Sequence, residues 1–506
     1  MGKRIRIGCG AGYAGDRIDP AVDLARDGAL DYLVLECLAE RTVALAQLEK
    51  LRDPAKGYGQ LLEQRMAALL PYCLENGVKI ITNLGAANPE AALEITAGLA
   101  EQMGLKPLKL AALLGADVRP VLRGQADAQE QEQGHPLDWK EQQEQGQGHC
   151  LEQTQKQARV QEQQKAPQQE QEQEQEQEQE QEGVVWETGT PISSLIRSGR
   201  VVSADAYLGA EAILPALQAG ADVIITGRVA DPSLFLAPMV YEFGWELDDW
   251  HRLGQGTVVG HLLECGAQVT GGYFADGRYK KVENLADVGF PLAEIEADGS
   301  AVIAKLESSG GAVNLRTCKE QLLYEIHDPS AYLTPDVTAD FKGVFLQEVA
   351  PDQVKVTGGA GLPRPDSLKV TVGVLDGYRG EGMIGYAGHG AVERARLAQE
   401  ILEKRFARLD LGLEQFRFDL VGLNALHGTI GEKNSPQPYE VMLRAAVKGQ
   451  AEQEVQKAMQ EVEVLWVNGP GGPGGVRKQV IPLVAAYSTT VSREKVRPHF
   501  VYRGLR

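Results

Sequence analysis

A glycine-rich turn directly after the first apolar stretch constrains this chain more than any other feature. Gly10, Gly12 and Gly15 follow an Ile-Arg-Ile run with the G-x-G-x-x-G spacing. A helix is expected next, with Asp19 as its cap and a proline in its first turn. Such a loop gathers backbone N–H groups and a helix N-terminus at one point, which attracts phosphate, pyrophosphate or carboxylate. The sequence therefore predicts a ligand site, and an enzyme as the protein that carries it.

Short apolar strands alternate with helical stretches at the start of the chain. The strands are expected at 4–8, 31–37, 78–82 and 109–114. Because they are apolar almost throughout, they predict an α/β fold, with a mainly parallel sheet covered by helices on both faces. Ligands of such sheets bind beyond the carboxyl ends of the strands. We therefore expect the site among the residues that follow each strand, at 10–17, 36–41 and 83–88.

The pattern divides the chain into four parts. Residues 1–123 and 184–296 are expected to form one α/β ligand-binding domain, and 124–183 a low-complexity insert rich in Gln and Glu. Residues 297–467 mix short strands with two helices and predict an α+β domain, a ferredoxin-like sandwich. Residues 468–506 form a Gly/Pro-rich loop and a C-terminal tail.

The insert carries most of the chain's charge. Between Gly124 and Gly183 there are fifteen acidic and four basic residues, so −11 of the formal net charge of −19 lies there. With hardly any apolar residue to form a core, this part is expected to be disordered or a solvated helix. A role as a partner-binding tail is the less favoured alternative. The acidity argues against nucleic acid as a partner.

Composition indicates a soluble globular protein. Apolar residues make up 43% of the chain, no apolar run has the length of a membrane span, and the first residues lack the apolar stretch of a signal peptide. The six cysteines form no C-x-x-C pair, so neither a zinc site nor a disulfide framework is predicted. We expect a cytoplasmic protein that binds a small molecule, without membrane or nucleic-acid partners, and that forms a homo-oligomer.

Three carboxylates are the first candidates for chemistry. Asp16, Glu36 and Glu40 fall at adjacent strand ends if the sheet is parallel. Carboxylates in a partly dry cleft push their pKa values apart, which gives a general acid and a general base. The same groups are suited to Mg²⁺, so no metal site is assigned and Mg²⁺ stays open. Equally open are structural roles, an N-cap for Asp16 and an ion pair of Glu40 with Arg41.

A second turn resembles the first one. The apolar stretch 222–226 ends in Gly-Arg, and Asp231-Pro then begins a helix. Arg228 is placed to bind a carboxylate or phosphate, while Asp231 serves either the ligand or the helix as its N-cap. Asp205 and Tyr207 end another strand and are candidates to orient a substrate, with core packing as the alternative for Tyr207. The remaining candidates for substrate or phosphate binding are Arg17, Asn83 and Asn88.

Two histidines complete the candidate catalytic set. His261 shares a helix face with Glu264, at i and i+3, and His327 ends a helix. A structural role is the more common one for a single histidine. Cys9 lies in the glycine turn, where N–H groups would lower its pKa, although packing is favoured. The H-E-x-x-H, G-x-S-x-G and Walker patterns are absent from the sequence, which disfavours zinc proteases, α/β-hydrolases and P-loop NTPases.

The residues alone do not decide which ligand the glycine turn binds. Glu36 lies about 20 residues after the turn, where a ribose-binding acid of a dinucleotide site would be. Asp16 follows the glycines directly and would repel pyrophosphate. A phosphate or acyl-CoA group is therefore favoured over nicotinamide or flavin, with a purely structural turn as the third alternative.

Several blocks stand out in order along the chain, namely Ile5–Arg17, Leu35–Thr42, Thr82–Pro89, Ala204–Gly209, Thr226–Asp231, Thr270–Phe274 and Gln321–Pro329. Together they resemble the acyclic terpene utilisation (AtuA-like) family. The resemblance extends to about residue 465 and omits the insert. It implies a role in bacterial breakdown of citronellol- and geraniol-type compounds through branched acyl-CoA thioesters.

The resemblance implies lyase- or hydratase-like chemistry on an acyl-CoA or hydroxy acid. Alternatives are an NAD- or flavin-dependent oxidoreductase and a non-catalytic subunit of a carboxylase or lyase complex. The chain departs from the family pattern in its insert, in its long Gly/Pro-rich tail and at Asp117, which stands alone where a pair of acids is expected.

Overall fold

The computed structural model describes residues 2–124, 183–434 and 438–505, so the predictions for the Gln/Glu insert fall almost wholly outside the described residues. The chain forms two compact units. Unit 1 comprises Met1–Gly373 and Ala486–Arg506, and unit 2 comprises Val374–Ala485. The expected domain boundary at residues 296 and 297 thus does not coincide with the division between the units.

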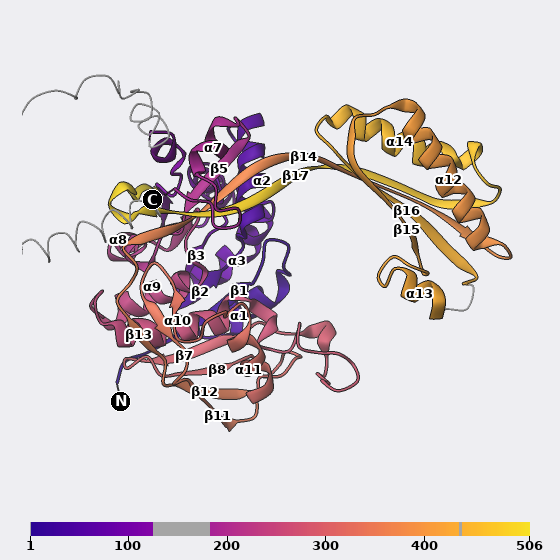
Figure 1. The fold of residues 1–506 in the computed structure, drawn as a ribbon. Helices are drawn as coiled ribbons and strands as arrows, with labels where there is room; N and C mark the ends of the chain where they lie inside the picture. Colours follow the sequence, from indigo (N-terminus) through magenta and orange to yellow (C-terminus); the bar gives the residue numbers. More distant parts are fainter. Residues whose placement is uncertain (1, 125–182, 435–437, 506) are drawn as a thin grey trace, which may run out of the picture. The chain divides into compact units, whose positions relative to one another are not determined.

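Five parallel strands form the centre of a ten-stranded sheet in unit 1 (Figure 1). In sheet order they are β1 (Arg4–Ala11), β2 (Tyr32–Leu35), β3 (Lys79–Thr82), β6 (Val223–Thr226) and β4 (Leu108–Leu114). Each neighbouring pair among them is parallel. The α/β fold that the apolar strands predict is confirmed in this region.

Antiparallel strands extend the sheet at both sides, so the sheet is mixed. β18 (His499–Leu505) pairs with β4. Beyond β1 follow β7 (Leu292–Glu296), β8 (Ala301–Ala304), β12 (Gln353–Thr357) and β11 (Phe345–Ala350). Three of these four strands lie in the range 297–467 that the sequence pattern assigns to the second domain. They join the first sheet because β7 pairs antiparallel with β1, Arg4 opposite Glu296.

Helices cover both faces of this sheet. α1 (Asp19–Asp27), α3 (Leu62–Asn76) and α4 (Pro89–Gln102) pack in one apolar cluster with Leu33 and Leu35. Tyr32, whose side chain points to the opposite face of β2, donates to Glu242 of α9 (Asp231–Phe243) at 2.5 Å.

Three further helices complete the main helical set of unit 1. α2 (Glu40–Arg52) follows β2, α10 (Trp250–Glu264) is almost wholly buried, and α11 (Leu315–Leu323) carries a capping box at Asn314. Short helical segments among the described residues include α7 (Ile192–Arg197), α8 (Leu214–Gln218), η1 (Ala210–Ala212), η2 (Gly266–Gln268), η3 (Leu285–Asp287) and η4 (Arg493–Lys495).

A small sheet packs against α10. It contains β13 (Ala360–Leu362), β10 (Thr338–Asp340) and β9 (Tyr332–Leu333). A Cβ atom at Gly254 of α10 would lie 2.0 Å from the carbonyl oxygen of Ala360, so only glycine permits this approach. β9 is thereby held close to the C-terminal half of α10, where the ring of His261 contacts Tyr332.

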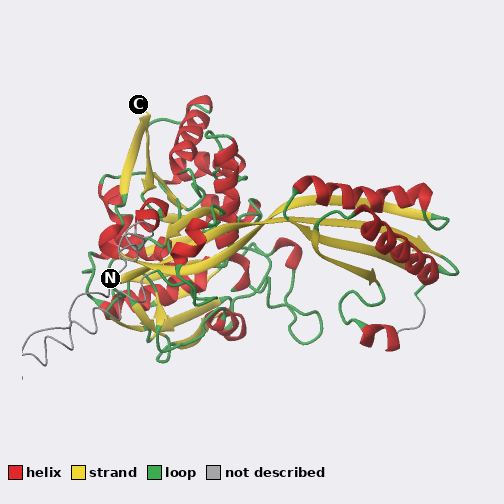
Figure 2. Cartoon of the chain, turned by 45° about the horizontal axis from the view of Figure 1, so that its top comes forward, coloured by secondary structure: helices red, strands yellow, loops and turns green. Residues whose placement is uncertain are grey.

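Unit 2 has one layer of strands and one of helices. Its elements, in chain order, are β14 (Ser367–Ala387), α12 (Ala391–Leu409), β15 (Leu413–Val421), α13 (Thr429–Asn434), β16 (Glu440–Gly449), α14 (Glu452–Asn468) and β17 (Pro473–Ser492). The sheet order is β15-β16-β14-β17, and β5 (Val201–Ala206) of unit 1 pairs with the part of β14 that lies in unit 1. Helices α12 and α14 lie on one face of the sheet (Figure 2), and their apolar residues form the core against it. Of the helices that the structure describes, none has the length and apolar character of a membrane span.

Candidate functional site

A cavity of about 990 Å³ lies in unit 1 beyond the carboxyl ends of the parallel strands. Residues that follow β1, β2 and β6 line it, namely Gly12, Asp16, Glu36, Glu40, Arg228 and Asp231. Glu264 and Cys265 at the end of α10, the segment from Tyr324 to Leu333, and Lys369 of β14 complete much of the wall. The strand-end rule for α/β sheets thus accounts for where the cavity lies.

Arg228 is the cation around which the charges of the cavity are arranged. Its side chain is 2% exposed, and the guanidinium carbon lies 4.0 Å from the centre of the Tyr207 ring. It donates to the carbonyl oxygen of Leu38, and its Nη2 lies 3.3 Å from Asp231 Oδ1. A buried guanidinium needs such partners, because an unpaired charge is costly away from water.

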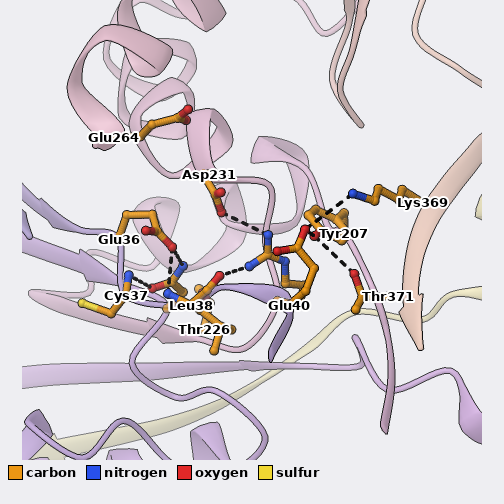
Figure 3. A network of polar contacts seen from close by, with 12 residues as sticks. Glu36, Cys37, Leu38, Glu40, Tyr207, Thr226, Asp231, Glu264, Lys369 and Thr371 are labelled. Atoms are coloured by element: carbon orange, nitrogen blue, oxygen red, sulfur yellow. Dashed lines mark hydrogen bonds and ion pairs between the residues drawn. The ribbon is translucent and has the colours of Figure 1, made fainter. Parts of the chain in front are cut away.

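Glu40 is the carboxylate that this cation holds ionised. Its Oε1 accepts a hydrogen bond from the Tyr207 hydroxyl at 2.6 Å and lies 3.5 Å from Lys369 Nζ. Burial disfavours the charge, but Arg228, the Tyr207 hydroxyl and Lys369 outweigh it and lower the pKa of Glu40 to about 2. Figure 3 shows Glu40, Tyr207 and Lys369 together on one side of the network.

Glu36 lies in the opposite electrostatic environment. It is 8% exposed, and its Oε1 accepts from the Leu38 N–H at 2.8 Å and from Asn83 Nδ2 at 3.0 Å. Burial, and after it the nearby Asp231 carboxylate, raises the pKa of Glu36 to about 8. The proton of the neutral acid belongs on the other oxygen, Oε2, because both donors bind Oε1.

Asp231 interacts electrostatically with both Glu36 and Glu40. It is the first residue of α9, whose N-terminus has no side-chain cap, so the alternative role as an N-cap is wrong. Burial raises its pKa, and Arg228 opposes that shift. In Figure 3 Asp231 lies above the space between Glu36 and Glu40.

The cavity wall also includes Glu264, whose carboxyl group is paired with His261. Glu264 Oε1 lies 2.8 Å from His261 Nδ1, so the predicted pairing at i and i+3 forms. Burial raises the pKa of Glu264 well above its usual range and lowers that of His261 to about 4. Burial thus favours the neutral form of each group. His261 is 1% exposed, its ring lies against Tyr332 and Phe341, and it does not line the cavity.

The glycine turn is closed by its own aspartate. Gly12 N donates to Asp16 Oδ2 at 2.9 Å, so this N–H is not free for an anion. A Cβ atom at Gly12 would lie 2.3 Å from the backbone of Cys265, which makes glycine necessary for packing. Asp19 is the first residue of α1 rather than its cap. Burial raises the pKa of Cys9, so the alternative of a lowered pKa is wrong, and the full burial of Cys9 agrees with the favoured packing role.

The predicted site residues divide between the cavity and the surrounding structure. Eight of them line the cavity: Gly12, Asp16, Glu36, Glu40, Tyr207, Arg228, Asp231 and His327. Gly10 is part of β1 and packs on Leu33 and Leu35, while Gly15 lies against the Tyr13 ring. Arg17 pairs with Asp19 and lines a separate cavity of about 200 Å³.

Both asparagines serve the protein rather than line the cavity. Asn83 is fully buried and holds Glu36 and the Cys37 N–H, and Asn88 donates to the carbonyls of Pro54 and Lys56. Asp205 also lies outside the cavity wall.

Asp117 has an acidic neighbour after all. Its backbone forms an isolated antiparallel β-bridge with that of Asp205, and its side chain forms an ion pair with Arg119 at 2.6 Å. Burial, followed by the Asp117 charge, raises the pKa of Asp205 to about 7. The pair of acids that is missing from the local sequence is thus formed between two separate segments.

Sequence reasoning missed several residues of the wall. Lys369 comes from β14, which is adjacent because Tyr207 N donates to the Lys369 carbonyl oxygen at 2.9 Å. Tyr273, Tyr324, Glu325 and Tyr332 also line the cavity. No local pattern identifies them, although some lie in the segments that resemble the family. Within the described ranges, no group of three or more His, Cys, Asp and Glu residues is arranged to hold a metal ion.

Comparison with known proteins identifies the family. A family model described as acyclic terpene utilisation family protein AtuA matches residues 5–502, nearly the whole chain. No curated protein and no solved structure matches the chain. The matched range includes every residue of the cavity wall. The chain therefore belongs to the AtuA family of acyclic terpene utilisation.

Proposed function

We propose that this protein is an enzyme of acyclic terpenoid or branched-chain acid catabolism that adds or removes water, as a lyase or hydratase, on a hydroxyacyl thioester or hydroxy acid. The observation that carries the proposal is Glu36, a buried acid on the wall of the cavity with a pKa of about 8. A proton donor is most effective when its pKa lies near the working pH. Membership of the AtuA family supports the substrate class.

The proposed dehydration uses two neighbouring carboxyl groups. Asp231, ionised beside Arg228, removes the proton from the carbon next to the carbonyl. Glu36 donates its Oε2 proton to the departing hydroxyl group, the carbon–oxygen bond breaks, and water and a carbon–carbon double bond form. The proton on Asp231 then returns to Glu36, and hydration is the reverse sequence.

Asn83 and Glu40 are positioning residues in this scheme. Asn83 fixes Glu36 Oε1, which leaves Oε2 to exchange the proton. Glu40 keeps its charge and holds Tyr207 and Lys369 beside Arg228. Neither needs to change its protonation state during the reaction.

A dinucleotide-dependent reaction is supported less well. The Gly12 N–H is already accepted by Asp16, and Glu36 bonds to Asn83 and Leu38. Both groups would have to leave these partners to bind pyrophosphate and ribose. A shift of the melting temperature with NAD would favour this alternative.

For unit 2 we infer a ferredoxin-like arrangement. Its main elements follow the order β-α-β-β-α-β, with a short α13 inserted, and the sheet order β15-β16-β14-β17 agrees with that arrangement. All residues of the cavity wall belong to unit 1.

The experiment that tests the function is a turnover assay. Hydroxyacyl and enoyl thioesters of acyclic terpenoid acids are offered to the wild type, to Glu36→Gln and to Glu325→Gln, which changes an exposed acid of the same wall. We expect water addition or loss by the wild type and by the control, and a loss of about 10²–10⁴-fold in Glu36→Gln. Full activity of Glu36→Gln would remove Glu36 from the mechanism.

A further inference from the structure

The charges of the cavity wall restrict which head group a ligand presents there. Among the residues that the structure describes, seven carboxylic side chains line the cavity, against two basic ones besides His327. The acids are Asp16, Glu36, Glu40, Asp231, Glu264, Glu325 and Asp328, and the bases are Arg228 and Lys369. Even with Glu36 and Glu264 uncharged, five of these acids face the two bases, so a ligand carboxylate or phosphate would enter a site of its own sign.

Both basic side chains already have partners inside the protein. Arg228 donates to Leu38, pairs with Asp231 and lies over Tyr207. Lys369 lies 3.5 Å from Glu40 Oε1 and 4.9 Å from the centre of the Tyr207 ring. An incoming anion would have to compete with Asp231 and Glu40 for these cations.

Two of the acids, Glu36 and Glu264, are suited to donate a hydrogen bond to an uncharged oxygen of a ligand. Glu36 is a buried acid held through one oxygen, and Glu264 is 6% exposed and paired through one oxygen with His261. If His261 were charged, its Nε2–H would be a buried donor without a partner, which is costly. In the neutral pair with the imidazole proton on Nδ1, Nε2 carries no proton, and the carboxyl proton belongs on Glu264 Oε2, which is also buried without a partner among the described residues. Neutral carboxyl groups donate to hydroxyl and carbonyl oxygens without an ionic partner.

The rest of the wall is suited to hydrocarbon. Tyr273 and Leu333 are 71% and 65% exposed, and Tyr324, Tyr332, Ala267 and Ala331 lie on the same wall. The Tyr273 and Tyr324 rings contact each other, with centres 6.2 Å apart. A cavity with an aromatic part and a carboxyl part favours a ligand that has an apolar chain and a polar end.

We propose that the cavity binds an acyclic chain through an uncharged oxygen head, an alcohol or a thioester, and excludes the free carboxylate. The inference deepens the proposed function, on which it rests for the identity of the site. In an acyl-CoA ligand the thioester then enters the cavity and the charged nucleotide stays outside it. Of the substrate types considered, the thioester is favoured over the free hydroxy acid.

Binding measurements by calorimetry at pH 7 test this inference. The three probes are geraniol, the N-acetylcysteamine thioester of geranic acid, and geranate, which share one acyclic terpene skeleton. We expect geraniol or the thioester, or both, to bind at least tenfold more tightly than geranate, and the stronger of the two identifies the head group. Equal or tighter binding of geranate would overturn the inference, and so would the absence of binding by all three probes.

Glu40→Gln provides the matched variant. It releases Lys369 and part of the charge on Arg228, so geranate should gain about tenfold in affinity while geraniol changes little. Glu325→Gln, which removes an exposed acid without releasing either base, should raise geranate affinity much less. Equal effects of the two variants would contradict the role given to Glu40. Because binding is measured without turnover, these results stand even if Glu36→Gln retains activity and the proposed reaction fails.

Discussion

Glu36 and Glu40 are the same residue type, four positions apart, on two sides of one cavity. The pKa of the first is about 8 and that of the second about 2. Glu36 lies against Asp231 and bonds to neutral donors, whereas Glu40 lies among Arg228, Tyr207 and Lys369. The difference teaches that the neighbours, rather than the distance along the chain, decide which carboxyl group is able to move a proton.

Glu36→Gln removes the carboxyl group that we propose as the proton donor. The amide is able to keep the two bonds to Oε1 but has no proton to transfer, so kcat should fall by about 10²–10⁴-fold. The fold should survive, which circular dichroism and a cooperative melt would verify. Glu325→Gln is the control for a change of charge in the cavity. A variant that is both folded and fully active would show that Glu36 is structural.

Arg228→Met removes the cation that lowers the pKa of Glu40 and pairs with Asp231. Glu40 and Asp231 then lose their buried partner, but their side chains are 41% and 34% exposed, so the cost should be about 2–3 kcal/mol, less than for a fully buried pair. We expect the free energy of unfolding in urea to fall by that amount. Arg17→Met, at an exposed pair with Asp19, should cost no more than about 1 kcal/mol. Equal costs for the two variants would mean that Arg228 does not hold the network.

The dependence of stability on pH sharpens the comparison. The pKa of Glu36 is raised in the folded state, whereas in the unfolded chain it is about 4.3. The stability that this difference gives is fully present below about pH 4.3 and is lost as the pH rises through about 8. From pH 6 to pH 9 the wild type should therefore lose roughly 2–4 kcal/mol more than Glu36→Gln. Urea unfolding at both pH values measures this. Parallel pH profiles of the two proteins would contradict the raised pKa.

Glu40 should show the opposite dependence. Its lowered pKa gives stability that is present above about pH 4.3 and is lost as the pH falls through about 2. Tyr207→Phe removes one of the bonds that hold this charge, at a cost of about 1.5–3 kcal/mol at pH 7 for a bond to a charged group. The deficit should shrink toward pH 3. A deficit independent of pH would assign the loss to packing of the ring alone.

The position of the cavity could be predicted from the sequence because it depends on a rule of parallel sheets. Apolar strands that end in Glu36 and in Gly227-Arg228 had to bring those residues to one edge. The same rule did not identify which residue would touch a ligand. Asn83 also follows a strand, yet it is fully buried and serves Glu36.

Contacts between distant segments could not be predicted. Lys369 reaches the site because β14 lies beside Tyr207, and β7 extends the first sheet although it was placed at the very end of the first domain. Nothing in the local pattern of β8 or β12 specifies a partner. The sequence makes His261 a candidate for catalysis, but the fold buries its ring and leaves only its partner Glu264 on the cavity wall.

Infrared difference spectra of the wild type against Glu36→Gln and Glu40→Gln test the central contrast most directly. At pH 6 the first difference should contain the C=O band of a protonated carboxyl group, which disappears with a midpoint near pH 8. The second should contain only carboxylate bands down to about pH 3, because the pKa of Glu40 is about 2. If both groups titrate between about pH 4 and 5, like an unperturbed glutamate, the contrast on which this mechanism depends does not exist.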